Sequence, residues 1–120
     1  MNFKSKSLWL FIAYLLLLIC NSFFSFSIIP YKDIWKYDKL IHFSEYFVLG
    51  LLYINALLNQ DLNINKLYPI IFISLIPIID ESIQLFVPNR IASIYDALFD
   101  YLGCYIAMSL YYTIHRYKNG

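Results

Sequence analysis

The sequence contains few charged residues: nine Lys and Arg and eight Asp and Glu among 120 residues. A nucleic-acid-binding surface requires a concentrated excess of positive charge, whereas the formal net charge here is only +1. The two cysteines, Cys20 and Cys104, form neither a metal-ligand pattern nor a disulfide framework. We therefore expect no nucleic-acid partner, and we interpret both cysteines as packing residues.

Hydrophobic residues, in contrast, make up 61% of the chain and aromatic residues 20%, and the mean hydropathy is +0.60. A soluble domain usually has an apolar share of about one half. The composition therefore indicates a membrane protein. Because 120 residues leave no room for a separate soluble catalytic domain, any chemistry must come from the spanning segments or their short loops.

Four long apolar segments cover residues 8–29, 40–58, 67–87 and 91–114. Each is close to the ~20 residues that a helix needs to cross ~30 Å of hydrocarbon. Irregular backbone exposed to lipid would leave its amides unpaired, so helices are expected. We predict an all-α fold in which residues 1–120 form one domain, a bundle of four transmembrane helices.

The first segment has a second interpretation, because MNFKSKS followed by an apolar run is also typical of a signal peptide. We favour a retained helix, since the possible cleavage sites after it are weak. With the amino terminus in the cytoplasm, five Lys and Arg lie on the inner side and four on the outer side. This small excess favours cytoplasmic placement of both termini.

Three of the predicted spans carry polar side chains at helical spacing, which places them on one face of each helix. They are Asp38, His42 and Glu45 in the second span, Asp80, Glu81 and Gln84 in the third, and Asp96 and Asp100 in the fourth. The start of the second span, the end of the third and the start of the fourth share one membrane face in any alternating topology. The polar side chains should therefore lie at similar depth on one side of the membrane.

An ionised carboxylate near the bilayer centre costs about 2.5 to 3.5 kcal/mol. Exposing several acids to lipid would multiply this cost, so we predict that they face a shared, partly hydrated pocket in the outer half of the membrane. Acids outnumber the positive partners Lys39, His42 and Arg90, so we expect Asp80 or Glu81 to be protonated at neutral pH. The predicted pocket residues are Asp38, His42, Glu45, Glu81, Gln84, Arg90 and Asp96.

The order of these residues resembles the VanZ-like family of bacterial integral membrane proteins. Three motifs carry the resemblance: Asp38-Lys39-x-x-His42-Phe43-x-x-Tyr46-x-x-Leu49-Gly50, then Glu81-x-x-Gln84-x-Phe86-x-Pro88-x-Arg90, then Ser93-x-x-Asp96 with Gly103. The resemblance implies a multi-pass protein of the bacterial inner membrane. The family is named for a member linked to low-level resistance to the lipoglycopeptide teicoplanin, and the resemblance implies no settled reaction.

This sequence departs from the family pattern at three positions. Asp100 stands where the family usually has Asn, Asn89 where Gly is common, and Ala107 where a second Gly often follows. An asparagine can still adopt a left-handed turn, so Asn89 is a mild change. Asp100 adds a negative charge, and we therefore leave it out of the predicted site.

We favour a function in which the pocket binds the head group or amine of an amphiphile, such as a membrane lipid or a lipid-linked envelope component. Glu81 would be the central acid, carrying a proton or binding the ligand. His42 would be oriented by Asp38 or Glu45, and Arg90 would pair with Asp96 at the pocket mouth.

Three alternatives remain at this point. One is an intramembrane enzyme with His42 or Glu81 as general acid or base, although no nucleophile elbow, phosphate loop or H-E-x-x-H motif is present. Another is a proton-coupled transporter acting as a dimer, although the first span lacks the acid that four-span multidrug exporters carry there. The third is a purely structural role, with buried polar contacts worth about 0.6 kcal/mol each.

A metal site receives little support from the sequence. His42 with Asp38, Glu45 and Glu81 could bind a divalent cation, but one imidazole and several carboxylates on separate helices are a weak pattern. We therefore expect no metal and no cofactor, and we assign no catalytic residue. A homo-oligomer is compatible with the sequence.

Overall fold

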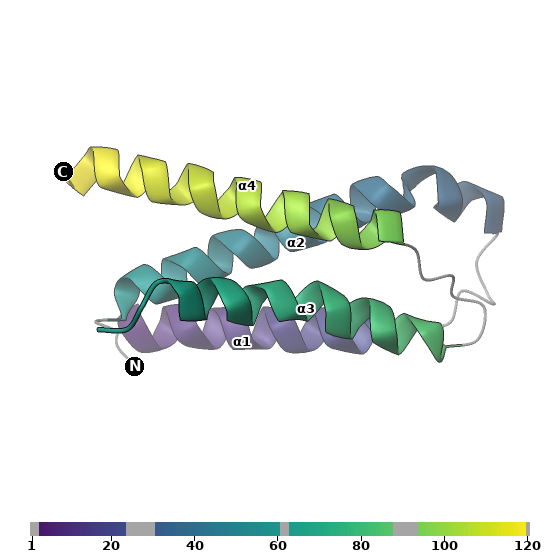
Figure 1. The fold of residues 1–120 in the computed structure, drawn as a ribbon, viewed down its shortest axis with the longest axis horizontal. Coiled ribbons are helices and arrows are strands. Elements are labelled where there is room, and N and C mark those ends of the chain that lie inside the picture. Colours follow the sequence, from purple (N-terminus) through teal and green to yellow (C-terminus); the bar gives the residue numbers. More distant parts are fainter. Residues whose placement is uncertain (1–2, 24–30, 61–62, 88–93, 120) are drawn as a thin grey trace.

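A computed structural model describes residues 3–23, 31–60, 63–87 and 94–119, with side chains from Lys4 in the first range and from Lys39 in the second. Its four helices are α1 (Phe3–Ser22), α2 (Tyr31–Asn59), α3 (Leu67–Leu85) and α4 (Ile94–Asn119) (Figure 1). The predicted all-α class is confirmed. The start of α2 lies well before the predicted span at residue 40, because a helix can continue beyond its apolar part into a polar segment.

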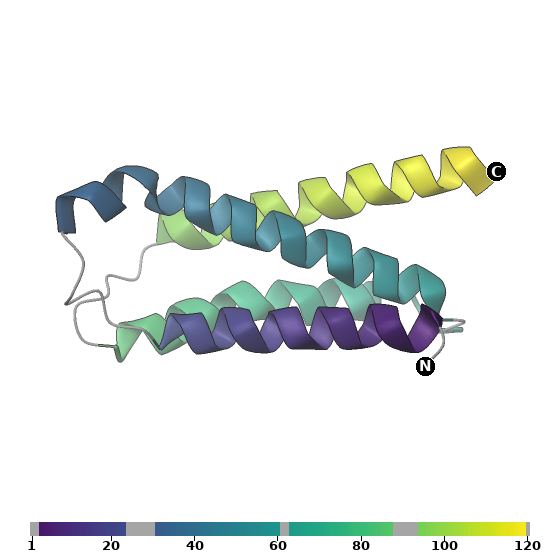
Figure 2. The same ribbon diagram turned by 180° about the vertical axis from the view of Figure 1, so that it is seen from behind.

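The helices form an elongated bundle with extents of 48 × 27 × 22 Å. Figure 1 and Figure 2 show α1 and α3 along one side, while α2 runs obliquely from α4 at one end of the bundle to α1 at the other. The start of α2, the end of α3 and the start of α4 lie toward the same end of the bundle. This is the arrangement that the alternating topology requires.

Two glycines allow the backbones of α2 and α4 to touch. A Cβ atom added at Gly50 would lie 2.5 Å from the carbonyl oxygen of Cys104, and one added at Gly103 would overlap the carbonyl oxygen of Phe43. No L side chain fits at either contact without moving a helix. This close packing fixes α4 against the middle of α2.

The outer surface is more apolar than that of a soluble protein, and several polar side chains are buried. Large apolar side chains lie on the outside of the bundle, where Leu17 is 69% exposed and Leu85 is 70% exposed. Polar residues lie inside instead: His42, Asp80, Gln84, Asp96 and Asp100 are all buried. They lie beside an apolar core that includes Leu49 and Ile73, and an apolar outer surface with polar groups kept inside is what a hydrocarbon environment favours.

Among the described residues, three helical stretches are long and apolar enough to cross a membrane: Lys4–Ser22, Lys39–Asn59 and Leu67–Leu85. The chain therefore has the character of a multi-pass membrane protein. Helix α4 is not one of the three, and it carries two buried acids and several tyrosines. Its 26 residues would extend about 39 Å at 1.5 Å per residue, so a fourth span stays a prediction.

Candidate functional site

Five side chains from three helices form a largely buried cluster toward the end of the bundle that holds the start of α2, the end of α3 and the start of α4. We call this cluster the polar centre. Its members are His42 from α2, Asp80 and Glu81 from α3, and Asp96 and Asp100 from α4. Asp100 is completely buried, and His42, Asp80 and Asp96 are each at most 4% exposed. The helical spacing seen in the sequence therefore produces one convergent site.

The imidazole of His42 lies at the middle of the polar centre. Its Nδ1 atom is 2.8 Å from Oδ1 of Asp100 and 3.9 Å from Oε1 of Glu81. Its Nε2 atom is 3.9 Å from Oδ2 of Asp96. An ionised Asp100 would accept a hydrogen bond from Nδ1–H, which fixes the ring orientation and directs Nε2 toward Asp96. Asp96 and Asp100 are one helical turn apart, so α4 presents an acid to each side of the ring.

Asp80 is held by two neutral donors. The hydroxyl of Tyr46 donates a hydrogen bond of 2.8 Å to Oδ2 of Asp80, and Nε2 of Gln84 donates one of 3.5 Å to Oδ1. Tyr46 lies one turn after His42 on α2 and is completely buried. Helix α2 therefore contacts both α3 and α4 through side chains that are one turn apart.

Lys39 lies at the edge of the polar centre. Its ammonium group is 3.4 Å from Oδ1 of Asp96, and it also approaches the ring of Tyr95, at 5.8 Å from the centroid. The side chain of Lys39 is 45% exposed, whereas that of Asp96 is 3% exposed. This ion pair marks the boundary between the buried cluster and the surface.

Four of the seven predicted pocket residues come together: His42, Glu81, Gln84 and Asp96. Glu45 instead contacts α1, where Nδ2 of Asn21 lies 3.4 Å from its Oε1 atom. Arg90 and the side chain of Asp38 lie outside the described residues, so the predicted pair of Arg90 and Asp96 is not tested. Within the described chain, Asp96 pairs with Lys39.

Two members of the polar centre were missing from the predicted site. Asp100 was left out because it departs from the family pattern, yet it makes the shortest contact to His42, where the prediction named Asp38 or Glu45. Asp80 was named among the polar side chains of the third predicted span but not among the predicted pocket residues. Helical spacing was the available signal for both, since Asp100 follows Asp96 by four residues and Asp80 precedes Gln84 by four.

The polar centre contains more acidic than basic groups. Four carboxylates surround one imidazole, and Lys39 reaches only the outermost of them. Oδ2 of Asp100 is buried and accepts no hydrogen bond from the described part of the chain. Protons, an amine or a metal ion would each compensate the charge of these acids.

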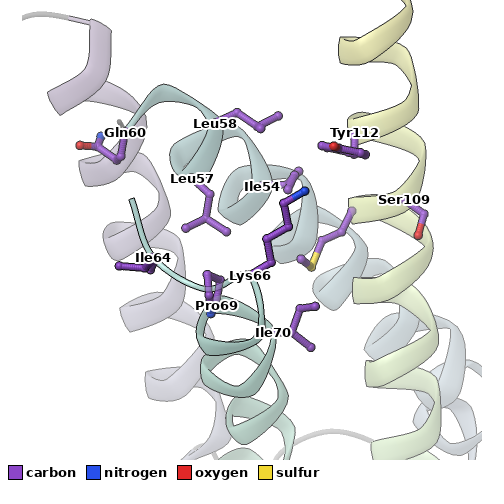
Figure 3. A pocket seen from close by; sticks show the side chains of 11 residues that line it. Ile54, Leu57, Leu58, Gln60, Ile64, Lys66, Pro69, Ile70, Ser109 and Tyr112 are labelled. Carbon is purple, nitrogen blue, oxygen red and sulfur yellow. The ribbon is translucent and has the colours of Figure 1, made fainter. Parts of the chain in front are cut away.

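A hollow of about 480 Å³ lies at the opposite end of the bundle (Figure 3). It is mainly apolar and is bordered by the end of α2, the start of α3 and the second half of α4. Its lining includes Ile54, Leu57, Pro69, Ile70, Met108 and Tyr112, with Lys66 as a charged residue. None of the predicted site residues lines this hollow, so it is separate from the polar centre.

Comparison with known proteins agrees with this arrangement. The family model described as VanZ/LLP1 matches residues 10–115, a range that contains the entire polar centre and both close-packing glycines. No curated protein and no solved structure matches the chain. The match covers most of all four helices and confirms the resemblance given by the three sequence motifs, so the chain belongs to the VanZ/LLP1 family.

Proposed function

We propose that this protein binds the polar head group of an amphiphile at the polar centre, in the outer half of a bacterial inner membrane. The observation that carries the proposal is a cluster of three buried carboxylates and one buried imidazole, with the partly exposed carboxylate of Glu81 beside them, inside a bundle with an apolar surface. A carboxylate within the hydrocarbon costs about 2.5 to 3.5 kcal/mol on insertion scales. Packing alone does not require this set of acids, and recognition of a polar group would give it a role.

The charges of the site favour a head group that carries an amine. An ammonium group would compensate the carboxylates around His42, while Lys39 at the edge could pair with an acidic part of the same ligand. Exposed apolar side chains next to these residues, such as Leu40, Ile79 and Leu98, would contact an acyl chain in the lipid. A lipid-linked envelope component or a lipoglycopeptide combines these features.

Family membership supports a role in the cell envelope. The resemblance links one member of the family to low-level teicoplanin resistance, and teicoplanin is itself an amphiphile. By holding such a molecule or its lipid-linked target in the outer leaflet, the polar centre would reduce the effect of the antibiotic.

Teicoplanin susceptibility tests this function. A sensitive bacterium would express the native chain, Glu81→Gln, Glu45→Gln or no chain, with membrane levels matched by immunoblot. Glu81→Gln removes the titratable group while keeping size and hydrogen bonding. Glu45→Gln is the matched control, because Glu45 contacts α1. The proposal predicts that the native chain and Glu45→Gln protect the bacterium and that Glu81→Gln does not. Equal protection by all three chains would refute the role of Glu81.

A second candidate is acid–base catalysis on a lipid-linked substrate. The 2.8 Å contact between His42 and Asp100 favours it, because a carboxylate on Nδ1 orients an imidazole for proton transfer at Nε2. Incubation of the purified protein with a lipid-linked cell-wall precursor, followed by mass spectrometry, would test this role. A product that forms with the native chain but not with His42→Gln would support catalysis, and an unchanged precursor would argue against it.

A further inference from the structure

We propose that His42, Asp80, Glu81 and Asp100 form a binding site for one divalent transition-metal ion, with Mn²⁺ and Zn²⁺ as the best-suited ions. We call these four residues the ligand set. Each offers one ligand atom, and the four atoms all lie within 4.8 Å of one another. This inference goes beyond head-group binding, because it concerns an ion that the protein would hold without an amphiphile.

The separations in the ligand set are close to those of a coordination sphere. Opposite ligands of an octahedral ion with bonds of about 2.1 Å are about 4.2 Å apart. The limit of 4.8 Å in the ligand set exceeds this value by little more than half an ångström. Rotation of carboxylate side chains can supply such a shift, so no helix needs to move.

An unsatisfied carboxylate oxygen gives independent support. Asp100 is completely buried, and its Oδ2 atom accepts no hydrogen bond from any described residue. Leaving a buried acceptor unsatisfied costs about 1 to 3 kcal/mol, and more when the group is charged. The other oxygen of the same carboxylate is 2.8 Å from Nδ1 of His42. A metal ion bound by Asp100 would supply a partner for this remaining oxygen.

Charge also favours a metal ion. Three ionised carboxylates with a neutral imidazole carry three negative charges, and a divalent ion reduces this to a single net negative charge. A divalent ion at the centre of the set would stabilise buried carboxylates that are costly to keep ionised in a membrane protein.

Surrounding side chains would position the ligands. A metal-bound histidine usually donates its second ring N–H to a carboxylate, and Asp96 lies 3.9 Å from Nε2 of His42. Tyr46 and Gln84 hold the two oxygens of Asp80. One imidazole with three carboxylates suits Mn²⁺ or Zn²⁺, whereas Cu⁺ prefers sulfur ligands and Ca²⁺ prefers a set composed of oxygen alone.

Metal titration of the purified full-length chain in detergent tests the proposal. After chelation and buffer exchange, Mn²⁺ would be added and the bound ion counted by electron paramagnetic resonance. We expect one tight Mn²⁺ per chain, competition by Zn²⁺, and an affinity at least tenfold lower in Asp100→Asn and Glu81→Gln. Glu45→Gln, an acid-to-amide change on α2 outside the ligand set, should bind like the native chain.

A spectroscopic measurement guards against variants that fail to fold. Electron–nuclear double resonance of Mn²⁺ bound to the native chain should show coupling to a nitrogen nucleus, because His42 supplies the nitrogen ligand of the set. Absence of stoichiometric Mn²⁺ and Zn²⁺ binding, absence of nitrogen coupling, or native affinity in Asp100→Asn would overturn the proposal. Neither teicoplanin nor a lipid-linked precursor is added in these measurements, so their failure would leave head-group binding to be judged separately.

Discussion

His42 lies between two acids of one helix, and Asp80 is bound by the hydroxyl of Tyr46. At the scale of single residues, each buried acid is therefore stabilised by a particular neighbour. Such contacts are worth more when an ionised group takes part, and removing one partner leaves the other buried without compensation. The phenol of Tyr46 is the simplest of these contacts to remove.

Tyr46→Phe should lower the free energy of unfolding by about 1 to 3 kcal/mol, because Asp80 loses a donor at a completely buried position. Unfolding in mixed detergent micelles would measure the change. Tyr14→Phe is the matched control, since its hydroxyl donates to the backbone carbonyl of Glu45 and its loss should cost about 0.5 to 1.5 kcal/mol. A smaller effect at Tyr46 than at Tyr14 would contradict the importance of the Asp80 contact.

At the scale of helices, the position of α4 against α2 determines whether Asp96 and Asp100 reach His42. The two glycine contacts lie in the same pair of helices as these acids, and Gly103 is one turn beyond Asp100. Separation of the two backbones would therefore move Asp100 away from the imidazole. Helix packing and site geometry are coupled through this crossing.

Gly103→Ala should separate α2 and α4, because the added methyl group meets backbone atoms of Phe43 and Phe47 that cannot rotate away. We expect a loss of about 1 to 3 kcal/mol in unfolding free energy, as for other overpacked interiors. Thermal unfolding monitored by circular dichroism would measure it. Ser109→Thr adds one carbon at an exposed position of the same helix and should have little effect. Equal stability of Gly103→Ala and the native chain would show that the crossing is not tight.

Sequence reasoning predicted the helices and the convergence of His42 with Glu81 and Asp96, because apolar length and helical spacing depend on local chain geometry. It did not predict the orientation of Glu45 toward α1. Glu45 follows His42 by three residues, so the spacing alone places the two side chains on the same face of the helix. Only the crossing of α1 over α2 decides which helix this acid contacts. The role of Asp100 was missed for a similar reason, because the approach of two helices at Gly103 is not visible in a single segment.

At the scale of the whole molecule, the account requires the polar centre to lie toward the outer face. The end of α3 would then be outside, and the connection between α2 and α3 would be cytoplasmic. Single cysteines at Phe86, which is 87% exposed, and at Asn63 would test this in intact cells after Cys20 and Cys104 are replaced by serine. A membrane-impermeant maleimide should label position 86 and should not label position 63. The opposite result would reverse the orientation.

A cysteine at Asn119 tests whether α4 crosses the membrane. If α4 spans the membrane, its end lies on the same side as Asn63. The cysteine at position 119 then stays unlabelled in intact cells and becomes labelled when the membrane is opened. Labelling of both Phe86→Cys and Asn119→Cys in intact cells would show that α4 returns to the outer face, which would contradict a bundle of four spans.

Binding of an amphiphile to the purified chain in lipid nanodiscs tests the central claim most directly. Native mass spectrometry with teicoplanin, and in parallel with a lipid-linked cell-wall precursor, would give the affinity of the native chain, Glu81→Gln and Glu45→Gln. The account predicts that the native chain and Glu45→Gln bind at least one of these probes equally. It also predicts that Glu81→Gln binds this probe at least tenfold more weakly, a difference of about 1.4 kcal/mol. Equal binding by all three chains, or binding of neither probe by the native chain, would contradict head-group recognition at the polar centre.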